Sequence, residues 1–170
     1  ISVVTAVLDR ARVVGDCLQS VLAQTHPHVE HVIIDGGSTD GTLEIVRANS
    51  GRVGHLVSER DGGLYEAINK GLAAATGDVI GILGADDVYA SAATLAQIAA
   101  AFQDGADASF GDLVYVDEQG RVVRTWRASP FRPGRFLRGW MPPHPTFFVR
   151  RSVYARLGAY DTRFRIAADY

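Results

Sequence analysis

The sequence predicts an α/β fold in which helices flank a mostly parallel sheet. Short apolar, β-branched runs alternate with segments whose apolar residues recur at helical spacing. Strands that are joined through helices pair in parallel and wind with one hand, which gives a doubly wound sheet. We expect strands at residues 1–7, 29–35, 53–58 and within 77–87, and helices at residues 14–22, 43–46, 64–75 and 95–102.

The pattern changes after Gly111. Two short β-rich runs flank Asp117-Glu118-Gln119-Gly120 and predict a β-hairpin. A Pro- and Arg-rich segment follows at residues 129–145 and is too long for a tight connection. A strand at residues 146–149 and a short helix at residues 152–157 complete the pattern. We see no internal repeat and no linker, so we expect one domain over residues 1–170. Because the chain stops inside a patterned region, we expect that domain to be C-terminally incomplete.

Charge is divided unevenly along the chain. Residues 1–120 contain 6 Lys and Arg against 17 Asp and Glu, whereas residues 121–170 contain 11 against 2. This division favours an acidic half that collects a metal ion and a basic half that meets phosphate or an anionic surface. A solvated basic face without a partner is the alternative. Nucleic acid is disfavoured because no binding motif accompanies the arginines.

The cellular setting follows from two absences in the sequence. No apolar run approaches the roughly 20 residues that span a bilayer. The single cysteine, Cys17, allows no internal disulfide and lies on an apolar helical face, where core packing is its expected role. We expect a cytoplasmic protein that works at the inner face of the membrane.

Two adjacent carboxylates, Asp86 and Asp87, follow the apolar run of residues 77–87. Ligands bind beyond the carboxyl ends of parallel strands, and neighbouring like charges are unfavourable there without a cation or solvent. A Mg²⁺ or Mn²⁺ ion shared with a diphosphate would offset that repulsion. A solvated strand-to-helix turn is the alternative.

A glycine turn, Asp35-Gly36-Gly37-Ser38-Thr39-Asp40-Gly41, follows the second expected strand. Its glycines allow the backbone to approach a ligand closely. It does not match G-x-G-x-x-G, and the chain has no Walker-type Gly-Lys-Ser/Thr. A nicotinamide dehydrogenase and a P-loop nucleotidase are therefore disfavoured.

Several short stretches stand in a specific order and spacing along nearly the whole chain. They are Ser2-Val3-Val4-Thr5, residues 20–25, residues 34–42, residues 61–71, Thr76-Gly77-Asp78, Asp86-Asp87, residues 144–148 and residues 166–170. Together they resemble family 2 glycosyltransferases, enzymes of the Rossmann-like GT-A fold that use nucleotide-sugar donors.

The resemblance implies a donor site in residues 1–112. Asp35 would lie at the nucleobase pocket, which Thr5 and Asp61 would flank. Asp87 would be the direct ligand of Mn²⁺ or Mg²⁺, and Asp86 would lie nearer the ribose. A metal bound to the diphosphate offsets the charge that develops on the leaving group.

The resemblance assigns the acceptor side to residues 113–170. Asp169 matches the family's catalytic base, which takes the proton of the acceptor hydroxyl as it attacks the anomeric carbon. His144 would orient the acceptor or touch the diphosphate, with a histidine bonded to backbone as the alternative. Trp140 would stack on a sugar beside the acceptor, with ordinary packing as the alternative.

The chain departs from the family pattern at two glycines. Gly36 stands where many relatives carry a second Asp, so we expect the base-pairing role to fall on Asp35 or base selectivity to loosen. Gly84 replaces the first acid of a full Asp-x-Asp, so the metal would rest on one carboxylate, the diphosphate and water.

The sequence thus favours a metal-dependent, inverting glycosyltransferase. It would move a sugar, most readily from a UDP-sugar, to a glycan or lipid-linked acceptor in polysaccharide or cell-envelope biosynthesis. A non-catalytic module that binds nucleotide-sugars is the alternative. A nucleotidyltransferase is a further rival, although the chain lacks a Gly-rich, Lys/Arg-bearing loop after the first strand. Peripheral membrane contact through the Arg-rich half is a further hypothesis.

Overall fold

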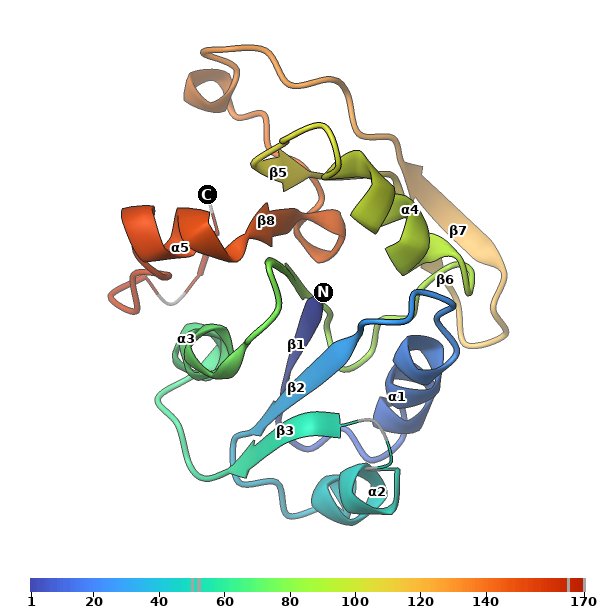
Figure 1. Ribbon diagram of the computed structural model, residues 1–170. Helices are drawn as coiled ribbons and strands as arrows, with labels where there is room; N and C mark the ends of the chain where they lie inside the picture. The colour runs from blue at the N-terminus through green and yellow to red at the C-terminus, as the bar shows by residue number, and fades with distance from the viewer. Residues whose placement is uncertain (50, 52, 165, 170) are drawn as a thin grey trace.

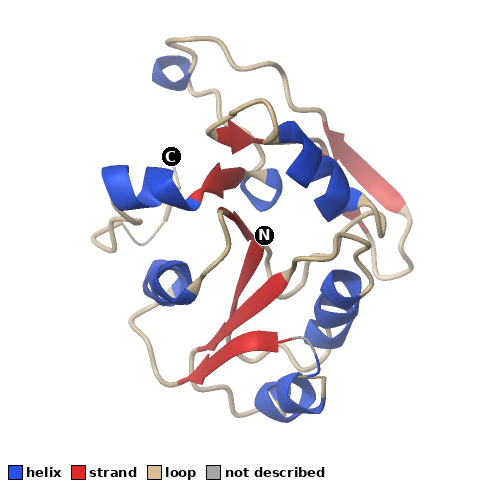
Figure 2. Cartoon of the chain, in the orientation of Figure 1, coloured by secondary structure: helices blue, strands red, loops and turns tan. Residues whose placement is uncertain are grey.

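A six-stranded sheet of order β3-β2-β1-β4-β8-β5 forms the centre of the molecule (Figure 1). The computed structural model describes residues 1–49, 51, 53–164 and 166–169. The strands of this sheet are β1 (Ser2–Val7), β2 (Glu30–Asp35), β3 (Val53–Ser58), β4 (Val79–Ile82), β5 (Ala108–Ser109) and β8 (Phe148–Arg150). A separate two-stranded sheet joins β6 (Leu113–Val116) to β7 (Val122–Trp126). The alternation of helices and strands is plain in Figure 2, as the sequence pattern predicts.

Five α-helices and the 3₁₀ turns η2 and η3 lie between and after the strands within the described residues. The α-helices are α1 (Val14–Leu22), α2 (Thr42–Ala48), α3 (Leu64–Ala74), α4 (Thr94–Ala101) and α5 (Arg151–Leu157). The 3₁₀ turns are η2 (Phe136–Arg138) and η3 (His144–Thr146). The expected α/β architecture is confirmed, and the last strand begins two residues later than the pattern predicts.

Parallel pairing joins the first four strands. β1 pairs with β2 along its whole length and with β4 on its other edge, while β3 extends the sheet beyond β2. Only β8 runs antiparallel, between β4 and β5. The carboxyl ends of β1, β2, β3 and β4 therefore lie at one edge of the sheet, where ligands bind in open α/β folds.

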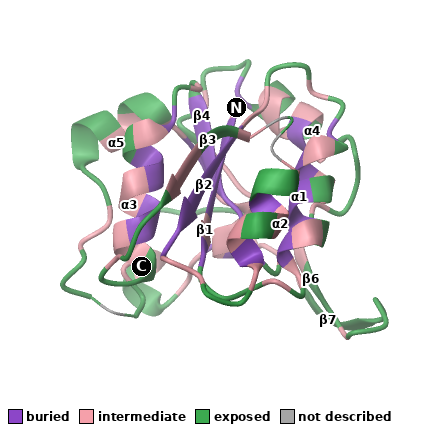
Figure 3. Ribbon diagram, turned by 90° about the horizontal axis from the view of Figure 1, so that it is seen from below, coloured by how far each residue is buried: buried purple, intermediate pink, exposed green. Residues whose placement is uncertain are grey.

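Apolar side chains cover both faces of the sheet. On one face, Val4, Val32 and Ile34 pack against α3. On the other face, one cluster gathers side chains from β1 with α1 and α4, and a second gathers side chains from β1 and β2 with α1 and α2. The buried strands and inner helix faces are purple in Figure 3, whereas the β6–β7 hairpin is largely exposed. Cys17 of α1 is fully buried in the cluster that β1 forms with α1 and α4. Burial raises the pKa of its thiol to about 12. Its role is therefore core packing.

Helix α3 approaches β1 unusually closely at Gly71. A β-carbon on residue 71 would overlap the Cγ1 atom of Val4, which is fully buried in β1. A close-packed interior cannot absorb such an overlap without backbone movement. Gly71 therefore sets the distance between α3 and the sheet, and with it the position of the loop that precedes α3.

We predict that Gly71→Ala lowers the free energy of unfolding by about 1–3 kcal/mol, because the added methyl group overpacks the core. Gly15→Ala is the matched control, since α1 leaves open space around that residue. The control should leave stability unchanged or raise it slightly, because Ala favours helix over Gly. Urea denaturation measures both variants, and equal stability of the two would contradict this account of the α3–β1 contact.

Candidate functional site

Hydrogen bonds tie together the loops that follow β1 and β2 at the carboxyl edge of the sheet. The backbone N–H of Asp9 donates to Ser38 Oγ at 2.9 Å, and the N–H of Thr39 donates to Asp9 Oδ1 at 2.8 Å. Asp9 has a positive φ of 51°, a conformation in which Asp is one of the better tolerated residues. The glycine turn predicted from the sequence is thus held in one shape by its neighbour.

Asp35 ends β2 with its side chain turned into the protein. The residue is 0% exposed, its Oδ2 accepts from Ser58 Oγ at 2.6 Å, and its carboxylate also accepts from the N–H of Ser38 at 3.2 Å. These donors satisfy the buried charge and join the ends of β2 and β3. The carboxylate of Asp35 thus supports the edge of the sheet, and its expected base-pairing role stays a prediction.

Thr5 also lies away from the edge. Its side chain is 0% exposed, and its Oγ1 lies 3.0 Å from Nε2 of His31 on the neighbouring strand. Burial lowers the pKa of His31 to about 4, so the imidazole is neutral at physiological pH. The Thr5 side chain is not exposed at the edge of the sheet, where it was expected to contact the nucleotide-sugar.

Asp61, in contrast, places its carboxylate against the turn at Gly36. A β-carbon on residue 36 would lie only 2.9 Å from Asp61 Oδ2. The other oxygen, Oδ1, accepts from the N–H of Gly63 at 2.9 Å, at the start of α3. Asp61 is half-buried, so it keeps contact with solvent. A carboxylate from the loop after β3 thus occupies the space beside residue 36.

Asp86 and Asp87 converge over Gly84, beyond the end of β4. A β-carbon on residue 84 would lie 2.7 Å from Asp87 Oδ2 and 3.1 Å from Asp86 Oδ1. The glycine therefore leaves room for both carboxylates. Burial, and then the charge of Asp86, raise the pKa of Asp87 above the usual carboxyl value. A cation between them would relieve this unfavourable arrangement.

The donor set at Gly84 fits a divalent metal that is completed by a ligand. In the described part of the chain, no group of three or more His, Cys, Asp or Glu side chains is placed to hold a metal ion. Mg²⁺ is commonly held by one or two carboxylates together with phosphate oxygens and water. Two converging carboxylates are consistent with that mode and not with a fully protein-bound ion.

Asp169 is anchored to the beginning of α3. The hydroxyl of Tyr65 donates to Asp169 Oδ1 at 2.9 Å, across 104 positions of sequence. Burial, followed by the bond to Asp169, raises the pKa of Tyr65, which keeps its phenol protonated as a donor. Ala167, two residues before Asp169, has a positive φ of 60°, which is unusual for Ala. The segment thus holds a strained turn that presents Asp169 to α3.

Tyr160 links this anchor to His144. Its hydroxyl lies 3.0 Å from Nε2 of His144, and its ring stacks on Tyr65 with centroids 5.6 Å apart. Asn69 of α3 holds the backbone of Tyr160 through two hydrogen bonds. Burial lowers the pKa of His144, and the charge of Asp169 only partly opposes this effect. His144 therefore lies in the network of Asp169 as a neutral imidazole at physiological pH.

Sequence reasoning missed Tyr65 and Tyr160 as members of this network. The one available signal was the position of Tyr65 just after the glycine pair that begins α3. Trp140, which the sequence placed near the acceptor, instead packs among Phe110, Phe131 and Phe136. Its indole N–H donates to Ser129 Oγ at 2.7 Å. The packing alternative describes Trp140 better than a sugar platform.

Comparison with known proteins gives relatives along nearly the whole chain. A PGL/p-HBAD biosynthesis glycosyltransferase of Mycobacterium bovis (strain BCG / Pasteur 1173P2) is 36% identical over 172 residues, which cover 99% of this chain and 66% of that protein. The O-antigen biosynthesis protein RfbC of Myxococcus xanthus is 34% identical over 171 residues, 93% of this chain and 13% of that protein. The chain thus spans just under two thirds of the length of the first of these curated relatives.

Solved structures share the fold. S. aureus TarS 1–349 in complex with UDP matches with a TM-score of 0.79 and 21% identity, over 99% of this chain and 52% of that one. The mannosyltransferase PcManGT from Pyrobaculum calidifontis, in complex with GDP-Man and Mn²⁺, matches with a TM-score of 0.70 and 24% identity, over 95% and 47%. The sheet and its carboxyl edge are therefore those of a GT-A fold.

The sequence model of glycosyl transferase family 2 matches residues 2–162 of this chain. This range contains the glycine turn with Gly36, the Asp86–Asp87 pair with Gly84, and His144. The chain belongs to glycosyl transferase family 2.

Proposed function

We propose that this chain transfers a sugar from a nucleotide-sugar to a glycan or lipid-linked acceptor in cell-envelope biosynthesis. The observation that carries the proposal is the convergence of Asp86 and Asp87 over Gly84, at the edge where Asp61 also lies. Relatives named for PGL/p-HBAD and O-antigen biosynthesis support the acceptor class. Neighbouring folds solved with UDP, UDP-GlcNAc and GDP-Man support the donor class.

Asp61 would recognise the nucleobase. Its carboxylate lies beside Gly36, the position where many relatives carry their second acid, so a loop from the next strand supplies the missing charge. A carboxylate accepts a hydrogen bond from the N3–H group of uracil, whereas the unprotonated N3 of cytosine offers it no donor. This contact favours UDP-sugars over CDP-sugars as donors.

Asp87 and Asp86 would hold Mn²⁺ or Mg²⁺ against the diphosphate, with Asp87 as the direct ligand and Asp86 nearer the ribose. When bound, such an ion offsets the charge that develops on the leaving nucleoside diphosphate. The glycine at residue 84 keeps the approach to both carboxylates open. A side chain there would fill the space in which diphosphate oxygens would sit.

Asp169 would take the proton of the acceptor hydroxyl. Tyr65 engages Oδ1, so Oδ2 is the oxygen that we assign to the acceptor proton. The hydroxyl oxygen forms a bond to the anomeric carbon as the bond to the diphosphate breaks, which inverts the configuration in one displacement. His144, neutral and bonded to Tyr160, would orient the acceptor beside it.

The site of action would be the cytoplasmic face of the membrane, where a lipid-linked acceptor could meet the donor. In the described residues, no helix combines the length and apolar character of a membrane span.

We predict that Asp87→Asn raises the melting temperature of the metal-free protein by a few degrees. Because the pKa of Asp87 is raised in the folded state, its charged form costs stability above that pKa. The amide removes this cost, so the gain should be largest near neutral pH and shrink as the pH falls toward the usual carboxyl range. Thermal denaturation across that pH range measures the effect.

The same variant should lose the stabilisation that Mn²⁺ and UDP together give the native protein, and calorimetry should show at least about tenfold weaker UDP binding with Mn²⁺. Asp104→Asn, which removes an exposed carboxylate from the segment after α4, is the control and should bind normally. Equal Mn²⁺-dependent UDP affinity in wild type and Asp87→Asn would count against the proposed donor site.

We predict that Asp169→Asn lowers the transfer rate of the full-length protein about 10²–10⁴-fold, as expected for loss of a general base. Affinity for UDP should not change. Tyr65→Phe should lower kcat about tenfold, because the carboxylate of Asp169 loses the hydrogen-bond donor that holds it in position.

Initial rates of transfer across a range of pH values measure both effects. Transfer that is unaffected by Asp169→Asn would remove this residue from its assigned role. Nucleotide-sugar binding without any transfer by the wild type would instead favour the non-catalytic binding module.

A further inference from the structure

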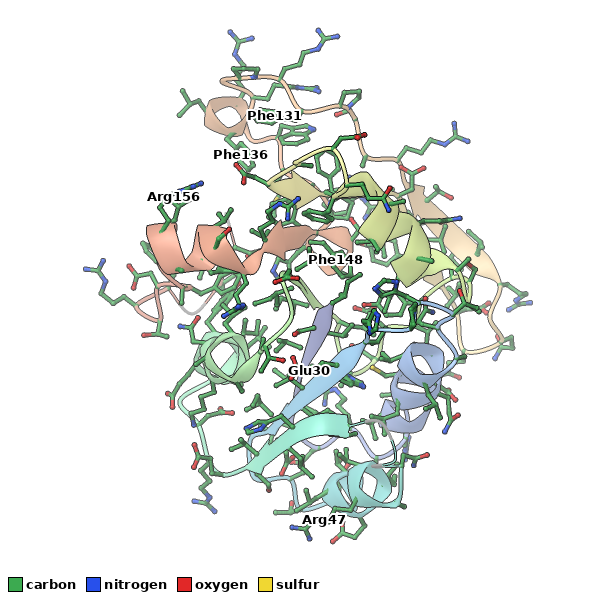
Figure 4. The ribbon with its side chains drawn as sticks, in the orientation of Figure 1. Glu30, Arg47, Phe131, Phe136, Phe148 and Arg156 are labelled. Atoms are coloured by element: carbon green, nitrogen blue, oxygen red, sulfur yellow. The ribbon has the colours of Figure 1, made fainter. Side chains whose placement is uncertain are left out.

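A long stretch of the chain carries positive charge with no acid of its own. Residues 119–160 contain nine Arg and no Asp, Glu or Lys. In the middle of this stretch, the segment between β7 and β8 arches away from the sheet at the top of Figure 1. Phe131 and Phe136, labelled in Figure 4, mark this end of the molecule, and Arg47 marks the opposite end. We name residues 129–140 the basic arch.

The basic arch is a built structure around Trp140. The indole N–H of Trp140 and the guanidinium of Arg135 both donate to Ser129 Oγ, at 2.7 and 3.0 Å. Arg135 also lies over the indole ring, 5.7 Å from its centroid, while Phe131 and Phe136 pack against it. These contacts close the arch on itself, so its outward side chains are presented in a fixed arrangement.

The outward surface combines apolar and cationic groups. Leu137 is 92% exposed and Phe131 is 54% exposed, although apolar side chains of this size are usually buried. Arg132 and Arg138 are exposed beside them. Among the described residues, no carboxylate lies within ion-pair distance of the guanidinium groups in the arch.

The same arginines line a hollow of about 510 Å³. Its walls are Ser129, Pro130, Arg132, Pro133, Gly134, Arg135 and Arg138. Guanidinium groups suit phosphate because they can donate two parallel hydrogen bonds to its oxygens. Leu and Phe side chains next to such a hollow suit the acyl boundary of a bilayer. Charge and apolar surface therefore both match an anionic phospholipid headgroup region.

Other occupants match less well. A second copy of the arch would bring the same arginines face to face. A single-stranded nucleic acid matches less well, because Leu137, the most exposed apolar side chain of the arch, offers no aromatic face for stacking, and the ring of Trp140 is covered by Arg135 and two phenylalanines.

We propose that the basic arch docks this domain on an anionic lipid bilayer. Arg132, Arg135 and Arg138 bind lipid phosphates, and Leu137 and Phe131 enter the headgroup–acyl boundary. The surface uses none of the residues assigned to donor, metal or acceptor proton. Its failure in a test would therefore leave the proposed transfer reaction untouched, and the reverse also holds.

The test is co-sedimentation of the full chain with vesicles of phosphatidylcholine alone or mixed with phosphatidylglycerol, at low and high salt. We expect binding to the mixed vesicles, weakened by salt, and little binding to phosphatidylcholine. The double variant Arg132→Gln/Arg138→Gln should reduce binding about tenfold or more. Leu137→Ser should reduce binding at both salt concentrations, and its high exposure means that it should fold normally.

Arg47→Gln is the matched control, because it removes one exposed positive charge from α2 at the opposite end of the molecule. It should change binding less than about twofold, since its charge lies at the end of the molecule opposite the arch. Absence of binding to mixed vesicles, or equal loss in Arg47→Gln and in Arg132→Gln/Arg138→Gln, would overturn the proposal. A dimer in sedimentation velocity that Leu137→Ser dissociates would also overturn it, by showing that a second copy covers the arch.

Discussion

Parallel pairing of β1 with both β2 and β4 is the constraint on which the rest of the molecule depends. It brings the carboxyl ends of strands that are distant in sequence to one edge, and each of those ends leads into a loop that carries an acid. Asp35, Asp61, Asp86 and Asp87 all lie at this edge, and Asp9 lies beside them in the loop after β1. Their mutual repulsion has to be offset by donors, by solvent or by a cation.

The edge uses two different solutions for its acids. Asp35 is fully buried and satisfied by Ser58 and the N–H of Ser38, which makes it part of the scaffold. Asp61, Asp86 and Asp87 stay partly open and lean over glycines, which leaves their free oxygens for a ligand. The absence of a side chain at Gly36 leaves room for Asp61, and its absence at Gly84 leaves room for Asp86 and Asp87.

The sequence allowed the longer strands, the hairpin and the acidic pair to be predicted, because each depends on local pattern. The two-residue strand β5 was not predicted. The orientation of the Thr5 side chain could not be predicted, because β1 is buried on both faces and its residues show no polar–apolar alternation that would tell which side chain faces α1. The contacts of Asp35 with Ser58, of Asp61 with Gly36 and of Tyr65 with Asp169 join distant segments. Such contacts follow only from the folded register, which no local pattern encodes.

We propose that Asp61 supplies the carboxylate that residue 36 lacks. The decisive experiment is calorimetric titration of UDP with Mn²⁺ into Asp61→Ala and into Asp61→Ala combined with Gly36→Asp. Loss of a charged hydrogen bond predicts about tenfold weaker UDP binding in the single variant and little change for CDP. The added acid should restore most of the UDP affinity, because removal of the Asp61 carboxylate opens the space beside residue 36. Wild-type UDP affinity in Asp61→Ala would contradict the claim.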